Sequence, residues 1–107
     1  MQYFNLDKIE AKELLPGFHG KFIHTENETF AFWEIEANCS LPAHSHPHTQ
    51  VLKLLEGEFE LAISGQKLYL KTGDVVSIAP NEEHAGRAIT RCKIIDTFHP
   101  VREDYKV

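Results

Sequence analysis

Short segments in which apolar and polar residues alternate recur along the chain, and they constrain its fold more than any other feature. Phe59, Leu61 and Ile63 alternate with polar or small residues, and the same period of two returns over residues 67–71. This period is typical of strands in a sheet with two unlike faces. Further strand-like segments lie at 29–36, 51–55, 75–79, 85–90 and 92–98. Turn-forming residues separate the segments, as in a small all-β sandwich or barrel.

The 107 residues support one domain. We expect its barrel core at about 30–98, N-terminal strands or a short helix within 1–25, and a C-terminal tail at 99–107. Only residues 6–15 suggest a helix, and Pro16-Gly17 would end it. Hydrophobic residues make up 42% and charged residues 25%, a balance that favours a globular protein over a disordered one.

The net charge and the cysteines limit the kinds of partner and the cellular location that we expect for the protein. The net charge of −5 argues against nucleic acid, because binding phosphates requires a basic face. Cys39 and Cys92 form neither a disulfide framework nor a C-x-x-C motif, which favours a reducing, cytoplasmic location. We expect neither a secretory leader nor a membrane partner, because no apolar run has the required length.

Three of the seven histidines fall within five positions, and Gln50 follows them. On a regular strand His44, His46, His48 and Gln50 would point to one side. Imidazoles spaced in this way can meet one metal ion, to which Gln50 would add a carbonyl oxygen. His84, beside a predicted strand, is the natural further ligand. The plainer alternative is a solvated loop, and His48 is either a neighbour of the site or a surface residue. Nothing in their spacing recommends the remaining histidines as ligands: His19, His24 and His99.

The spacing H-x-H-x-x-x-Q that begins at His44, with Gly57 downstream, resembles the first motif of the cupin superfamily. Residues 73–84 resemble the second motif, and the resemblance covers about 38–98. It implies an all-β, single-domain cupin, which is a small antiparallel β-barrel or jelly roll with one divalent metal ion at its centre. The implied metal ligands are His44, His46, Gln50 and His84.

Three residues depart from the usual cupin pattern. Gln50 replaces a glutamate, Ala88 replaces an asparagine, and Asn81 replaces a glycine but also tolerates a positive φ. Imidazole suits several metals, so Ni, Zn, Fe and Mn remain open. Because Gln50 is neutral, the ion would keep its full positive charge. This favours Lewis-acid chemistry on an anionic substrate over redox chemistry.

The last predicted strand carries a carboxylate among apolar residues. Ile94, Asp96 and Phe98 share one face, and a buried carboxylate is costly unless it is paired or functional. Asp96 facing inward would therefore be either paired or functional. In the alternative, Asp96 faces solvent and Ile95 faces inward. Arg102, beyond the strand, either folds back to the barrel mouth or remains a surface charge.

Residues 96–104, 44–50 and 55–61 together resemble one cupin family, the pectin degradation (KdgF-type) proteins, which linearise unsaturated uronates. Thr49 and His99 depart from the pattern of that family. The resemblance implies a small anionic sugar, 4-deoxy-hex-4-enuronate, as substrate, the linear 5-keto-4-deoxyuronate as product, and a homodimer.

In this interpretation Asp96 and Arg102 are the catalytic residues. Asp96 moves protons, and Arg102 pairs with the uronate carboxylate. Phe98 packs against the sugar ring and His48 contacts the substrate. Two alternatives remain: another metal-dependent cupin enzyme, such as a dioxygenase or a sugar isomerase, and a non-catalytic sugar-binding cupin. A dioxygenase would consume O2, whereas a binding module would not require Asp96.

Overall fold

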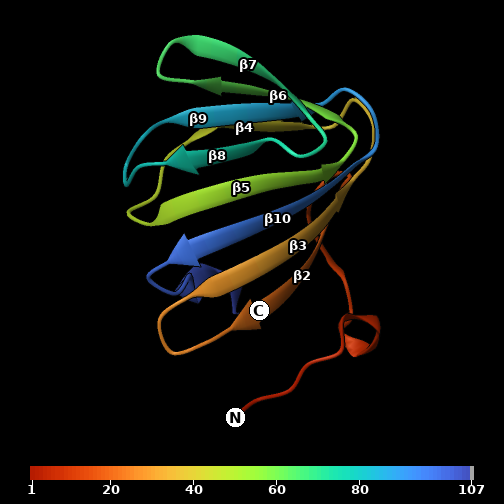
Figure 1. The fold of residues 1–107 in the computed structure, drawn as a ribbon, viewed down its shortest axis with the longest axis vertical. Helices are drawn as coiled ribbons and strands as arrows, with labels where there is room; N and C mark the ends of the chain where they lie inside the picture. Colours follow the sequence, from red (N-terminus) through yellow and green to blue (C-terminus); the bar gives the residue numbers. More distant parts are fainter. Residues whose placement is uncertain (107) are drawn as a thin grey trace.

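Two antiparallel sheets pack face to face in the computed structural model, which describes residues 1–106 (Figure 1). The six strands of the first sheet are, in order, β1 (Lys12–Leu15), β2 (Phe18–His24), β3 (Thr29–Ile35), β10 (Cys92–His99), β5 (Thr49–Glu56) and β8 (Val75–Ile78). The second sheet holds β4 (Ser40–His44), β9 (His84–Ala88), β6 (Glu58–Ile63) and β7 (Gln66–Lys71). This confirms the predicted all-β fold.

Alternation decides which side chains enter the core. On β6 every second residue is buried, as the sequence predicted, and β10 alternates in the same way along its whole length. Leu54 and Leu61 are no more than 2% exposed. Burying a side chain of this size stabilises the fold by about 1.5–3 kcal/mol. The core therefore lies between the sheets, and it includes one charged position on β10, Asp96.

Two turns adopt the backbone conformations that their residues favour. Ser64 and Gly65 both have positive φ, as in the two-residue turns that join β-hairpins, and they connect β6 to β7. Asn81 has a φ of 64°, so it adopts the left-handed conformation that the usual glycine would allow.

Of the two alternatives for residues 1–25, the structure has strands, and a helix over 6–15 is wrong. A 3-10 turn, η1 (Leu6–Lys8), is followed by β1, which pairs with β2 through Lys12 and Gly20. Pairing with a neighbouring strand outweighs the weak local preference for a helix. At the other end of the chain a second 3-10 turn, η2 (Glu103–Tyr105), follows β10. No helix within residues 1–106 is long and apolar enough to cross a membrane.

The histidine run is not one regular strand either. β4 ends at His44, residues 45–48 form a bend, and Gln50 belongs to β5. Pro42 and Pro47 lack the backbone N–H that a continuous ladder would need. The bend carries His46 back toward the cavity between the sheets.

Candidate metal centre and cavity

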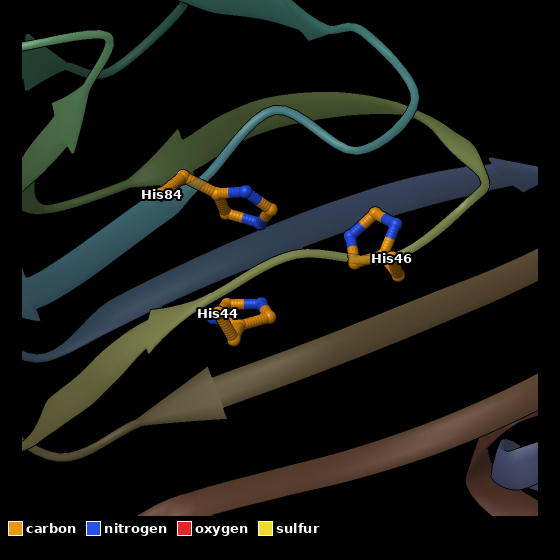
Figure 2. A group of neighbouring side chains, drawn as sticks. All are labelled: His44, His46 and His84. Atoms are coloured by element: carbon orange, nitrogen blue, oxygen red, sulfur yellow. The ribbon is translucent and has the colours of Figure 1, made fainter.

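Three histidines converge although they come from separate parts of the fold. His44 and His84 are register partners on β4 and β9, and their ring centroids lie 4.2 Å apart. His46 reaches the same point from the bend, as Figure 2 shows. One ring nitrogen from each lies within 4.8 Å of those of the other two. The structure thus brings together three of the four predicted ligands around one point.

Backbone carbonyls fix the tautomers of two of these rings. Nδ1 of His44 lies 2.9 Å from the Pro42 carbonyl oxygen, and Nδ1 of His84 lies 2.8 Å from that of Glu82. A carbonyl oxygen only accepts, so each Nδ1 donates and each Nε2 keeps a lone pair. Nε2 of His84 is buried without a hydrogen-bond partner among the described residues. A lone pair held in this way is what a metal ion requires of a histidine.

Gln50 connects this group to the rest of the cavity. Its Oε1 lies 2.9 Å from Nε2 of His46, and its Nε2 donates to Oδ1 of Asp96 at 2.9 Å. Burial lowers the pKa of His46 to about 4 and also lowers that of His84, so both rings are neutral at neutral pH. Neutral imidazoles and one amide oxygen suit a divalent transition metal. Gln50 as the fourth ligand stays a prediction.

Asp96 faces inward, so the alternative with Ile95 inward is wrong. Its side chain accepts from Nε2 of Gln50 and, at 3.1 Å, from Nε1 of Trp33. Burial raises the pKa of Asp96 to about 7, and the two donated hydrogen bonds and nearby Arg102 oppose this only in part. A carboxyl group with a pKa near neutrality can both take up and release a proton.

Arg102 folds back into the barrel, as one of the two predictions had it. It is 8% exposed, and its backbone N–H donates to Thr29 Oγ1 at 2.9 Å. The Asp104 carboxylate pairs with its guanidinium, and this lowers the pKa of Asp104. Phe98 is 1% exposed and lies on the same face of β10 as Asp96. Both Phe98 and Arg102 line the cavity.

A cavity of about 230 Å³ lies between the sheets beside these groups. Its volume is below the roughly 300–1,000 Å³ of pockets for drug-sized ligands, so it suits one small ring. Its lining includes apolar side chains such as Phe59, Leu61 and Ile94. It also includes polar side chains: His44, Gln50, His84, Asp96, Arg102 and Tyr105. A ligand held here would meet both apolar and hydrogen-bonding side chains.

His48 lies next to the site but not on the wall of the cavity. Its ring is half-buried, 5.4 Å from the ring of His46 and 6.3 Å from that of Phe98. Burial lowers its pKa. The structure therefore places His48 as a neighbour of the site, beside His46 and Phe98. Its contact with substrate stays a prediction.

Sequence reasoning missed Trp33, Asp104 and Tyr105. Trp33 lies 63 residues from its hydrogen-bond partner Asp96, so no local pattern connects the two. The only sequence feature that could have indicated Trp33 is its position in a strand-like segment, where alternate residues face the core. Tyr105 and Asp104 contact Arg102 through a turn that begins beyond the last predicted strand.

Residues 31–98 match the cupin domain family, and the chain belongs to this family. It is also similar to the pectin degradation protein KdgF of Dickeya dadantii (strain 3937). The two are 32% identical over 107 residues, which cover 97% of each chain.

Solved structures of other proteins are also similar to this chain. The structure of KdgF from Halomonas sp. matches with a TM-score of 0.90 and 25% identity, over 96% of this chain and 98% of that one. An RmlC-like cupin from Shewanella frigidimarina matches with a TM-score of 0.92 over 98% and 96% of the two chains. At 24% identity the second likeness shows the shared fold alone.

Proposed function

We propose that the protein is a metal-dependent enzyme of pectin or alginate breakdown that opens the ring of 4-deoxy-hex-4-enuronate. The observation that carries the proposal is that Asp96, a buried carboxyl group whose pKa burial raises to about 7, lines the same cavity as His44 and His84. The likeness to the KdgF proteins supports the choice of substrate. Asp96 also favours catalysis over sugar binding alone, since binding a neutral hydroxyl does not require a buried acid.

One divalent ion would be held by His44, His46, Gln50 and His84. When bound, it would supply a positive centre that stabilises an oxyanion on the substrate. Burial favours the neutral forms of the His46 and His84 rings, which leave their lone pairs available for it.

The reaction rearranges one hydrogen and exchanges no electrons. Asp96 takes the proton of the C1 hydroxyl, the bond between C1 and the ring oxygen breaks, and the ring oxygen becomes an enolate oxygen at C5. Asp96 then returns the proton to C4, which gives a ketone at C5 and an aldehyde at C1. A single group with a pKa near 7 is suited to both transfers.

Two further side chains would hold the substrate. Arg102 would pair with the uronate carboxylate, because a guanidinium presents parallel N–H groups that match it. The Phe98 ring, on the same strand face as Asp96, would pack against the sugar. A bound metal ion and Arg102 would together provide the local positive charge that an acidic protein needs to bind an acidic sugar.

The test follows the absorbance of the C4=C5 bond after metal-loaded protein is added to freshly made unsaturated monouronate. We expect faster decay than without protein. Asp96→Asn should lose this activity but keep its metal content. Decay equal to that of the protein-free sample would refute the proposal, and equal turnover by Asp96→Asn would remove that residue from the mechanism.

A further inference from the structure

The last residues of the chain hold the guanidinium of Arg102 from several directions. Asp104 accepts from Nε at 3.1 Å and from Nη2 at 2.6 Å, and Oη of Tyr105 accepts from Nη1 at 3.1 Å. The Tyr105 ring also lies against the guanidinium, with its centroid 3.9 Å from Cζ. The Phe98 ring is 4.8 Å from the same atom. Every nitrogen of this side chain therefore has a defined partner.

Tyr105 is itself held firmly. Its ring lies 4.9 Å from that of Phe22 and 5.5 Å from that of Phe98, and its backbone N–H donates to the Arg102 carbonyl at 3.1 Å. Burial raises the pKa of Tyr105 to about 12, so its hydroxyl stays neutral and leaves the charge of Arg102 intact. The ring can therefore act as a fixed platform beside the cavity, which it also lines.

The contacts leave part of the guanidinium available. A guanidinium has five N–H groups, and the described residues accept three of them from Arg102. The other two are one on Nη1 and one on Nη2. Two N–H groups are what a carboxylate needs for a two-point pair. The orientation of a carboxylate bound in this way depends on how rigidly the guanidinium is held.

We propose that Tyr105 is a positioning residue: its ring and hydroxyl hold Arg102 so that the two remaining N–H groups meet the carboxylate of a uronate in the cavity. The inference rests on the proposed function and adds a residue to it. Tyr105 acts through Arg102 and takes no part in proton transfer. Its loss should therefore weaken substrate binding more than it slows turnover.

Three metal-loaded variants test this by steady-state kinetics with the unsaturated monouronate. Tyr105→Leu removes the platform and the hydroxyl, and we expect KM to rise about tenfold with kcat within about twofold of the wild type. Tyr105→Phe keeps the ring, and KM should rise only about threefold. Tyr69→Leu is the matched control, because it makes the same change at an exposed position on β7 that does not line the cavity.

A rise in KM for both Tyr105 variants but not for the control supports the proposal. Unchanged KM in Tyr105→Leu, a fall in kcat alone, or an equal rise in Tyr69→Leu would overturn it. Should Tyr105→Leu not fold, Tyr105→Phe decides alone: a KM about threefold higher supports the proposal and an unchanged KM overturns it. Absence of turnover by the wild type would instead overturn the proposed function, and this inference with it.

Discussion

Asp96 should give folding stability a marked dependence on pH, because burial raises its pKa from 3.8 to about 7. The native state then binds this proton more tightly than the unfolded chain does. The contribution of Asp96 to stability is full below about pH 4 and is lost as the pH rises through 7. Three pKa units at about 1.4 kcal/mol each correspond to a loss of about 4 kcal/mol, of which about 2–3 kcal/mol falls between pH 5 and 8.

The assay compares urea unfolding of the wild type and Asp96→Asn, followed by circular dichroism with EDTA present from pH 5 to 8. Asparagine is close to aspartate in size but does not titrate. Its amide N–H would face the N–H of Trp33, and the loss of stability from this mismatch is the same at every pH. The histidines titrate in both proteins, so their effect cancels in the difference. We expect the stability of the variant, relative to the wild type, to improve by about 2–3 kcal/mol from pH 5 to 8.

Asp7→Asn is the control, since it removes one acidic charge from an exposed position that does not line the cavity. Parallel pH profiles of the wild type and Asp96→Asn would refute the reasoning. They would mean that the carboxyl group has solvent access, which the structure does not show.

Three further variants test other parts of the structure. His84→Ala should lower the bound metal, measured by elemental analysis, whereas the exposed His99→Ala should not; full occupancy in His84→Ala would contradict its role as a ligand. Gln50→Glu should keep the metal but lose at least about tenfold in turnover at neutral pH, since its carboxylate would face that of Asp96; wild-type turnover would count against the role of the amide. Gly86→Ala should lower the urea midpoint, because a Cβ there would lie 2.4 Å from a core ring, and such overpacking costs about 1–3 kcal/mol; an unchanged midpoint would show that the ring can move.

The sequence predicted those parts of the fold and site that depend on local patterns. Alternation is a local property, so it located β6 and β10 and favoured an inward Asp96. The strand β1 was missed because its stability comes from pairing with β2 and not from its own residues. The bend at 45–48 was also missed, since the parity of the histidines fits a straight strand equally well.

The other features that the sequence did not predict depend on contacts between residues that are far apart in the chain. The bond from Trp33 to Asp96 joins strands that are far apart in the sequence and adjacent in the sheet. The residues that hold Arg102 follow the last strand, where no periodicity exists to indicate their direction. Motif spacing nevertheless selected His44, His46 and His84, because the resemblance to known cupins carries information about tertiary structure that periodicity lacks.

The hydrogen bond between Trp33 and Asp96 gives the protein a built-in optical reporter. Trp33 is the only tryptophan in the chain, so its emission is not mixed with that of another indole. Its N–H points at the carboxyl group proposed to move the proton, and that group is joined through Gln50 to His46. Ionisation of the acid, entry of a sugar and loading of the metal can thus each be followed in solution by the fluorescence of one native residue, without an attached dye.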